Sequence, residues 1–282
     1  MSEATCRSRS GLAPGRLAAL LRRQLSAALS GFVQANIRVC QTITPHHLGE
    51  ASAFAQFRAA VVTSVLDLAP KTVVDIGAGR TWHNHPELKR MAGFRLVGVD
   101  ISMEEMAQNV ALDESVACDV TRSIDLPPGT ADLVTVRSGV EHFSDNEAFL
   151  RNLHALLRPG GRTLLVFPGP HAPFVLINRL LPTACARSLL RRLVPGSDGV
   201  LGFKAHYDRT SYRQFSRMAE RTGFKVLRCS CSYYSSVYFR FFLPLYLASL
   251  LLDHLRHALA IKSLASFYLF ILEKPAAAAT DK

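Results

Sequence analysis

The chain lacks a paired-cysteine motif. None of its six cysteines forms a C-x-x-C pair; they are Cys6, Cys40, Cys118, Cys185, Cys229 and Cys231. The spacing of Cys229 and Cys231 does not suit a zinc knuckle, and no other group of ligands has a recognisable metal spacing. We therefore expect no metal site, and isolated cysteines of this kind are typical of a reduced cytoplasmic protein.

Long hydrophobic runs are also missing. The first 30 residues carry arginines throughout and no continuous apolar stretch, which argues against a secretory signal. The uncharged stretch from Phe241 to Leu252 has 12 residues, whereas a membrane-spanning helix needs about 20. The surrounding segment 238–252 is nevertheless unusual, because it is rich in aromatic residues and is flanked by Arg240 and Arg256. It is expected to be a buried helix, an oligomer interface, or a peripheral contact with a membrane.

Acidic residues are scarce relative to basic ones. The chain has 33 Lys and Arg against 22 Asp and Glu, which gives a net charge of +11. The central residues 70–169 hold 10 basic and 13 acidic side chains, whereas residues 170–282 hold 16 and 6, and residues 1–69 hold 7 and 3. Basic flanks attract anionic substrates, nucleic acid or an anionic membrane surface, unless they are simply solvated helix faces.

The most informative run that is present extends from Val73 to Arg80. It reads as a short apolar strand that ends in Asp75 and a Gly-x-Gly turn formed by Gly77 and Gly79. Glycines are needed where the backbone takes an unusual φ close to a bulky ligand. A second strand, 96–99, ends in Asp100, an acid placed to accept the hydroxyl hydrogens of a ribose. The pattern predicts a nucleoside-containing cofactor at the carboxyl edge of a parallel sheet.

Two cofactor classes suit this pattern. A dinucleotide site needs a third glycine in Gly-x-Gly-x-x-Gly, and that position here is Trp82, which is far too large. S-adenosylmethionine (SAM) has no phosphate and needs the Gly-x-Gly turn, a ribose acid, and an acceptor for the adenine amino group. Asp119, which follows the strand-like segment 115–118, can accept from that amino group. The residues therefore favour SAM.

Strands and helices alternate through the centre of the chain. Further strands are expected at 131–136 and 163–167, and helices at 84–92, 102–111 and 145–157. A Pro-Gly-Gly break at 159–161 is expected to end the last of these helices before strand 163–167. This alternation predicts an α/β fold in which helices cover both faces of a parallel sheet.

The flanking regions are less regular. Apolar spacing predicts a helix over 14–35, either a cap over the cofactor site or a basic amphipathic helix on a membrane, and a second helix over 49–68. Later elements are expected at 210–222 (helix), from Phe224 (sixth strand) and at 266–272 (last strand), after a leucine- and arginine-rich insertion at 171–194. We divide the chain into a disordered tail (1–13), an N-terminal helical cap (14–69), a SAM-binding core (70–169), a substrate-recognition insertion with the C-terminal strands (170–274), and a second disordered tail (275–282).

Six segments in this order resemble the class I SAM-dependent methyltransferases, in particular the small-molecule, type 11-like subgroup. The matching segments are Val74–Gly79, Gly98–Asp100, Cys118–Val120, Ala131–Val134, Val140–Asp145 and Leu157–Gly161. The resemblance covers residues 55 to 170 well and the C-terminal third more loosely.

The resemblance implies a Rossmann-like, seven-stranded, mostly parallel sheet whose last strand runs antiparallel beside the sixth, with a C-terminal aromatic and hydrophobic insertion. It implies SAM as cofactor and a substrate-recognition role for the insertion. The cofactor-binding residues that it implies are Asp75, Gly77, Gly79, Asp100, Ile101, Asp119, Val120 and Arg137. One departure is Thr81, which stands where the family often has a further glycine.

Three histidines are candidate catalytic residues, because imidazole titrates near neutral pH. His142 lies just beyond the fourth strand, beside the expected methyl group, and is either a structural and substrate-positioning residue or a general base. His206 precedes the helix 210–222, and His171 follows the fifth strand. In-line displacement at a sulfonium can be catalysed largely by alignment of the acceptor, so a base is needed mainly for a hydroxyl acceptor.

Some chemistries are excluded by what is missing. The Asp/Asn-Pro-Pro-aromatic segment of DNA amino-methyltransferases is absent, since that place reads Arg137-Ser138-Gly139-Val140, and no cysteine follows a proline as in cytosine-C5 enzymes. We expect a methyltransferase acting on a small molecule or glycan, lipid-linked in one version of this hypothesis, and most simply at oxygen. The alternatives are an RNA methyltransferase that uses the basic flanks, although nucleic acid is the less favoured partner, and a non-catalytic relative. The expected location is cytoplasmic, with association at the inner membrane face as an open alternative.

Overall fold

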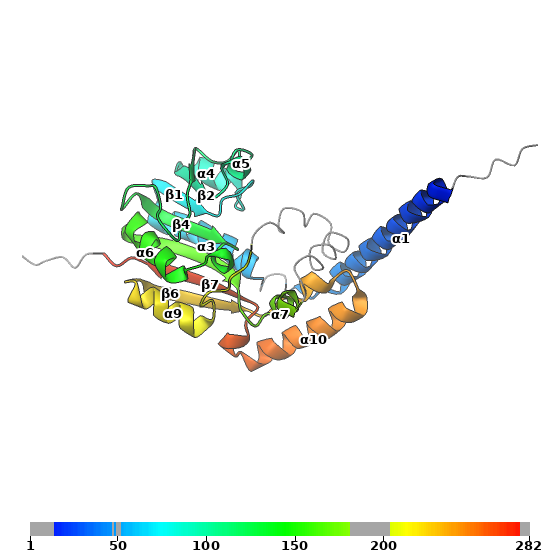
Figure 1. Cartoon of the computed structure of the whole chain (residues 1–282). Helices are drawn as coiled ribbons and strands as arrows, with labels where there is room; N and C mark the ends of the chain where they lie inside the picture. The colour runs from blue at the N-terminus through cyan, green and yellow to red at the C-terminus, as the bar shows by residue number, and fades with distance from the viewer. Residues whose placement is uncertain (1–13, 47, 49–51, 181–203, 277–282) are drawn as a thin grey trace, which may run out of the picture.

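A seven-stranded sheet forms the centre of the protein in the computed structural model, which describes residues 14–46, 48, 52–180 and 204–276 (Figure 1). The strand order is β3-β2-β1-β4-β5-β7-β6, and only β7 runs antiparallel to its neighbours. The strands are β1 (Thr72–Ile76), β2 (Arg95–Asp100), β3 (Glu114–Ala117), β4 (Ala131–Arg137), β5 (Leu157–Pro168), β6 (Lys225–Ser232) and β7 (Phe267–Glu273). The predicted α/β, Rossmann-like sheet and its antiparallel last strand are confirmed.

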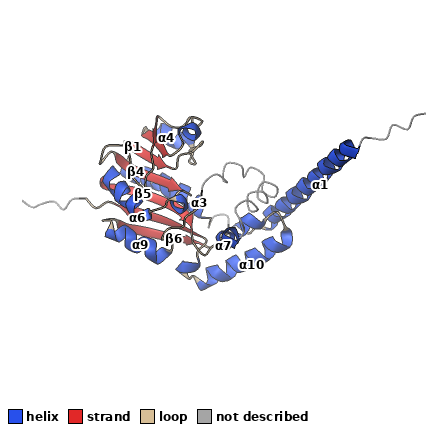
Figure 2. Cartoon of the chain, viewed as in Figure 1, coloured by secondary structure: helices blue, strands red, loops and turns tan. Residues whose placement is uncertain are grey.

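Helices cover both faces of this sheet (Figure 2). They are α1 (Pro14–Ile43), α3 (Ala53–Leu68), α4 (Pro86–Ala92), α5 (Met103–Met106), α6 (Asn146–Leu156), α7 (Pro173–Leu180), α9 (Tyr212–Arg221) and α10 (Leu243–Leu259), with short 3-10 turns η1 (Val140–His142), η3 (Ser236–Phe239) and η4 (Lys262–Leu264). Helix α3 packs against β4, β5, β6 and β7, whereas α6 and α9 pack against β5 and β6 on the other face. In the part of the chain described here, no helix is both long and apolar enough to cross a bilayer.

The strands are apolar on both sides because both sides are covered. In β1, Val73 belongs to the core beneath α3 and its neighbour Val74 belongs to the core beneath α6 and α9. The same alternation holds for Leu164 and Leu165 in β5. Successive side chains of a strand point to opposite faces, so these continuous apolar runs stabilise two helix layers at once.

Two predicted elements were wrong in extent. The helix expected over 102–111 is only the short α5, which ends at Met106. The side chain of Asn109 donates to the carbonyls of Ala78 (3.1 Å) and Gly79 (3.3 Å) and accepts from the N–H of Ala111 (3.3 Å). These bonds favour a turn in place of further helix. The Pro-Gly-Gly segment 159–161 does not separate helix from strand. It lies within β5, where Gly160 N–H donates to the carbonyl of Lys274 at 2.8 Å.

Helix α1 does not cap the cofactor edge of the sheet. It pairs with α10, and its N-terminal half extends away from the sheet (Figure 1). The contacts include a 2.7 Å hydrogen bond between the hydroxyls of Thr44 and Tyr246 and a 2.8 Å bond from the N–H of Leu243 to Asn36 Oδ1. Of the two described helices in the expected cap 14–69, α3 is the one that packs extensively on the sheet. The expected tail 1–13 and most of the insertion 171–194 lie outside the described residues.

Candidate cofactor and acceptor site

The Gly-x-Gly turn connects the end of β1 to the tip of β2. Gly77 and Gly79 adopt φ of 72° and 46°, a left-handed backbone that disfavours side chains. The N–H of Gly77 donates to the carbonyl of Val99 at 2.8 Å, and the N–H of Gly79 donates to Asp100 Oδ2 at 3.1 Å. A Cβ placed on either glycine would meet no atom within 4 Å, so the space over the turn is open to a ligand.

Asp100 is held at the carboxyl end of β2 in one orientation. Its Oδ1 accepts from the N–H of Ser102 at 3.0 Å, while its Oδ2 accepts from Gly79. Each carboxylate oxygen retains a lone pair for a further donor, as a ribose diol requires. The adjacent Ile101 is 60 % exposed, which leaves an apolar side chain free to pack on an adenine ring.

Asp75 lies beneath the turn rather than on the surface. Its carboxyl group is 6 % exposed and accepts a 2.6 Å hydrogen bond from the hydroxyl of Thr135 on β4. Burial raises the pKa of Asp75 to about 7, although the Thr135 hydrogen bond and the Arg137 charge oppose the shift. The charge of this group is therefore set by what binds above it.

Asp119 follows β3 and is fixed by its own turn. Its Oδ1 accepts from the N–H (2.9 Å) and the hydroxyl (2.7 Å) of Thr121, and its Oδ2 lies 3.5 Å from Arg122. The Thr121 hydroxyl bond is the main cause of the lowered pKa of Asp119. The next residue, Val120, is buried and its carbonyl accepts from Asn152 at 2.9 Å. The predicted adenine contacts therefore lie just beyond the end of β3, the strand that pairs with the end of β2 at Asp100.

The departure at Thr81 leaves the turn intact. Thr81 is exposed, and the following Trp82 turns into the core, where it packs edge-on against Phe94 with ring centroids 5.9 Å apart. Across the turn, Arg80 makes a bidentate ion pair with Glu105 at α5. The open turn, the oriented Asp100 and the exposed Ile101 fit the parts of SAM that they were predicted to hold.

A cationic and aromatic region adjoins the turn on the side of α3. The Arg137 guanidinium, at the end of β4, lies 4.7 Å from the ring centre of Phe54. Desolvation, together with the charges of Arg137 and Arg58, lowers the pKa of His83 to about 4, so this imidazole is neutral at physiological pH. The sequence reasoning missed His83. Its only signal was its position four residues after Gly79, the second glycine of the turn.

Glu141 is the other residue that the sequence reasoning missed. It lies in η1 with 6 % exposure, its Oε2 has no hydrogen-bond partner among the described residues, and burial raises its pKa to about 8. Its charge acts on two phenols, because Glu141 contributes to the raised pKa values of about 12 for Tyr207 and Tyr238, after desolvation in both cases. The Glu-His pair at 141–142 marked this place, but only the histidine was singled out.

The three predicted histidines do not form one cluster. His142 and His206 lie near each other: the backbone N–H of His206 donates to the carbonyl of Glu141 at 2.8 Å, and the His206 charge contributes to the lowered pKa of His142, which is caused mainly by burial. The ring Nδ1 of His142 lies 3.2 Å from the carbonyl of Lys204. His171 is exposed after β5, and none of the described contacts connects it to the other two. All three roles stay predictions.

A clamp holds residues 204–210 against η1 and α6. Arg209 donates to Glu147 (2.6 Å), Asp145 (2.9 Å) and Asp208 (2.9 Å). The fully buried Asn146 adds a 2.7 Å bond from its amide to the carbonyl of Asp208. The clamp begins directly after Tyr207, which has a φ of 52°, unusual for a residue with a side chain. It therefore fixes the position of Tyr207 beside Glu141.

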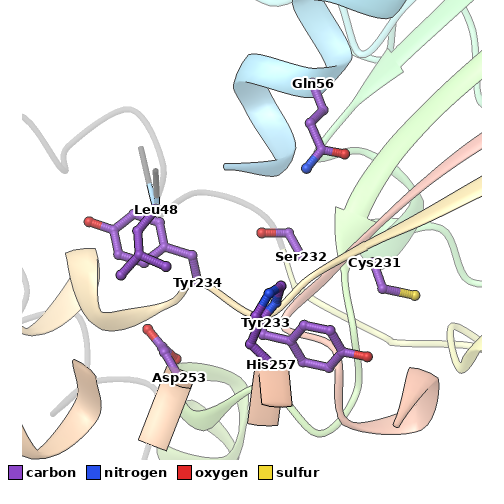
Figure 3. A pocket seen from close by; sticks show the side chains of 8 residues that line it. All are labelled: Leu48, Gln56, Cys231, Ser232, Tyr233, Tyr234, Asp253 and His257. Carbon is purple, nitrogen blue, oxygen red and sulfur yellow. The ribbon is translucent and has the colours of Figure 1, made fainter. Parts of the chain in front are cut away.

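A small pocket lies at the other end of the same sheet edge (Figure 3). Its walls come from Gln56 on α3, the end of β6 and the inner side of α10, with Leu48 beside Tyr234. Since β4, β5 and β7 separate β6 from β1, this pocket is distinct from the Gly-x-Gly turn. No group of three or more potential metal ligands occurs among the residues with a described position.

The fold and the glycine turn define a class I SAM-dependent methyltransferase. A family model for the methyltransferase domain matches residues 38–228, and the chain belongs to this family, whose methyl donor is SAM. The cofactor and enzyme class expected from the sequence are therefore confirmed at the level of the family.

Individual relatives are distant. Norajmaline N-methyltransferase of Rauvolfia serpentina is 32% identical over 105 residues, which are 34% of this chain and 36% of that protein. Demethylmenaquinone methyltransferase of Thermus thermophilus is 28% identical over 133 residues, or 44% of this chain and 60% of that protein. The chain thus matches less than two thirds of the length of either. The crystal structure of geranyl diphosphate C-methyltransferase from Streptomyces coelicolor is similar in fold, with a TM-score of 0.50 and 14% identity over 77% of this chain and 80% of that one.

Proposed function

We propose that this protein transfers the methyl group of SAM to an oxygen of a small-molecule or glycan acceptor that carries an anionic or readily ionised group. The observation that carries the proposal is the pair of cations Arg137 and Arg58, whose charges act on each other and on His83 after the glycine turn, with Phe54 against Arg137. Tyr238 stacks on Phe174 with centroids 4.3 Å apart, which supports a flat or ring-shaped acceptor. The demethylmenaquinone methyltransferase relative adds a quinone-like ring to the acceptors worth testing.

In this proposal, different residues of the chain bind the cofactor and the acceptor. Gly77, Gly79 and Asp100 hold the cofactor, and the flanking Ile101, Asp119 and Val120 bind its adenine. SAM, when bound, supplies a sulfonium-linked methyl group for in-line displacement. Arg137, predicted from sequence as a cofactor contact, here attracts the acceptor and favours its ionised oxygen, since a nearby cation stabilises an anion.

A neutral acceptor hydroxyl needs a proton acceptor. Glu141 and His142 are adjacent in η1, and both have pKa values shifted by burial, upward for the carboxyl group and downward for the imidazole. The upward shift brings the Glu141 carboxyl group into the range where a base works near neutral pH, whereas the downward shift makes the His142 imidazole a weaker base. We place Glu141 first, because its unpartnered Oε2 is buried among Tyr207 and Tyr238.

The first experiment is calorimetric binding of S-adenosylhomocysteine to the purified protein. We expect binding in the wild type and at least tenfold weaker binding in Asp100→Asn, which corresponds to about 1.4 kcal/mol. The matched control is Asp125→Asn, an exposed carboxylate in the loop after β3. A folded wild-type protein that binds no cofactor would contradict the proposed function.

The acceptor side is tested with Arg137→Gln and labelled SAM. We expect a raised KM for acidic phenols or uronate-type sugars and an unchanged affinity for S-adenosylhomocysteine. Loss of cofactor affinity in this variant would instead show that Arg137 binds the cofactor, as the sequence predicted. A cytoplasmic location at the inner membrane face and a lipid-linked acceptor are further parts of the proposal, and the surface described next bears on them.

A further inference from the structure

The polarity of α10 is reversed relative to an ordinary surface helix. The side that faces the protein carries Tyr246, Ser249, Asp253 and Arg256, all buried. The side that faces outward carries six exposed leucines, which are Leu245, Leu247, Leu251, Leu252, Leu255 and Leu259. Leu251 is 72 % exposed. A helix at a protein surface normally buries its apolar side, so this arrangement calls for an external partner.

The inward polar residues account for the attachment of α10. Asp253 accepts from the N–H (2.8 Å) and hydroxyl (2.9 Å) of Ser235 and from the N–H of Ser236 (2.7 Å). Arg256 donates to the hydroxyl of Ser266 at 3.0 Å and to the carbonyl of Leu264. Polar contacts therefore fix the orientation of the helix, and the outward leucines are left between 39% and 72% exposed.

Helix α1 extends the apolar surface. Its exposed residues Leu25, Leu29, Phe32, Val39 and Ile43 recur at spacings of three, four and seven and so share one side of the helix. This side adjoins α10, because Phe32 contacts Phe242 with ring centroids 6.5 Å apart. We call the six outward leucines of α10 and these five residues of α1 the apolar ridge. Figure 1 shows the two helices together, apart from the end of the sheet that carries α4 and α5.

The charges around the apolar ridge have one sign. Residues 14–46 contain no Asp or Glu, and Arg22, Arg23 and Arg38 on α1 are exposed. Between 236 and 264 the one acidic residue is Asp253, which is buried, whereas Lys262 is exposed. A second copy of this chain would bring cations against cations. An anionic lipid surface matches both the apolar side and the charge.

We propose that the apolar ridge docks the protein on an anionic membrane surface, with α1 and α10 lying along the interface and the exposed arginines of α1, together with Lys262 just beyond α10, on the lipid headgroups. The leucines and Phe32 enter the boundary between headgroups and acyl chains, and neither helix crosses the bilayer. This attachment would account for the proposed location at the inner membrane face, but it does not depend on the acceptor or on catalysis, so failure of the vesicle test would leave the proposed methyl transfer standing.

The test is sedimentation of the full chain with vesicles. We expect binding to vesicles of 30 mol% phosphatidylglycerol in phosphatidylcholine, and at least tenfold weaker binding to pure phosphatidylcholine or in 0.5 M salt. Leu251→Glu should reduce binding at least tenfold. Met91→Glu on α4, an equally exposed apolar side chain outside the apolar ridge, should bind like the wild type.

Three results would overturn the proposal. They are no binding to anionic vesicles by folded wild-type protein, binding that survives Leu251→Glu and Leu255→Glu together, and a concentration-dependent dimer in light scattering that Leu251→Glu abolishes. The last result would assign the apolar ridge to a second copy. Folding of each variant is checked by thermal unfolding, and Arg22→Gln with Arg23→Gln supplies a milder change that should weaken binding to anionic vesicles alone.

Discussion

Asp75 and Glu141 are buried carboxyl groups that make no hydrogen bond to a cationic side chain within the described ranges 14–46, 48, 52–180 and 204–276. Both have pKa values well above those of free carboxyl groups, to about 7 and about 8. Such groups cluster at functional sites, because burial that would be unfavourable elsewhere tunes a charge for binding or proton transfer. Each makes a measurable prediction.

For Asp75, stability should depend on pH in a defined direction. The unfolded chain loses the Asp75 proton near the ordinary pKa of 3.8, whereas the folded protein keeps it to a pKa of about 7. The contribution of Asp75 to the free energy of unfolding is therefore full below pH 4 and is lost as the pH rises to 7. In Asp75→Asn, the decline between pH 5 and 7 should be smaller by up to about 3 kcal/mol.

Urea unfolding of the cofactor-free protein at several pH values measures this effect. Asp125→Asn should follow the wild type at every pH, because its carboxyl group is exposed. Parallel curves for wild type and Asp75→Asn would mean that Asp75 is ionised in the folded protein. Glu141 contributes a slope of the same sign in both proteins, so it does not affect the comparison.

For Glu141, the pH profile of catalysis discriminates between the two candidate bases. If Glu141 accepts the proton, kcat rises with pH to about 8, the pKa of the buried group. We expect this rise to be absent in Glu141→Gln and retained in His142→Gln. The reverse pattern would make His142 the base and leave Glu141 a structural residue.

At the scale of elements, the Arg209 clamp determines how the loop 204–210 meets η1. Arg209→Gln removes contacts to three carboxylates, and because the guanidinium is 36% exposed the loss of stability should be only about 1–2 kcal/mol. The larger effect should be on the acceptor KM, since Tyr207 is no longer fixed opposite Glu141. Steady-state kinetics and thermal unfolding measure both, with the exposed Arg213→Gln as control. An unchanged KM would show that the clamp is structural alone.

Apolar periodicity and turn residues predicted most helices and strands, because an apolar run that ends in an acid is a local signal. The strands β1, β2 and β4 and the residues Asp75, Gly77, Gly79 and Asp100 follow from such runs. The short α5 could not be predicted, since its end depends on Asn109 bonding to a turn thirty residues earlier. The polar inward side of α10 could not be predicted either, because Asp253 accepts hydrogen bonds from Ser235 and Ser236 only in the folded chain.

The candidate site was predictable only on its cofactor side. Glycines and strand-end acids carry that signal in their spacing. Glu141 acquires its raised pKa from burial, and the lowered pKa of His83 depends on desolvation and on the charges of Arg137 and Arg58, which no spacing reveals. The candidate residues of the acceptor side could therefore be identified only in the folded structure.

At the scale of the whole molecule, the sheet with α3 and the pair of helices α1 and α10 should differ in local stability. Helix α3 packs against four strands, whereas the main contact of α1, among the residues described, is α10. Backbone amides of α1 should therefore exchange with deuterium at least tenfold faster than those of α3. Anionic vesicles should slow exchange in α1 and α10 and leave α3 and β1 unchanged. Equal protection of α1 and α3 in solution would contradict this division.

The position of β7 has a consequence for synthesis. Among the described strands, β6 pairs with β7 alone, and β7 inserts between β5 and β6 although it follows both in the chain. On the ribosome, β1 to β5 can assemble first, while the apolar residues of β6 and α9 stay uncovered until β7 is made. Closure depends on contacts such as Arg162 with Glu273, far apart in sequence, and contacts of this kind form slowly. A nascent chain arrested before residue 267 should therefore carry a folded cofactor-binding half and an α9 whose apolar side chaperones can still bind.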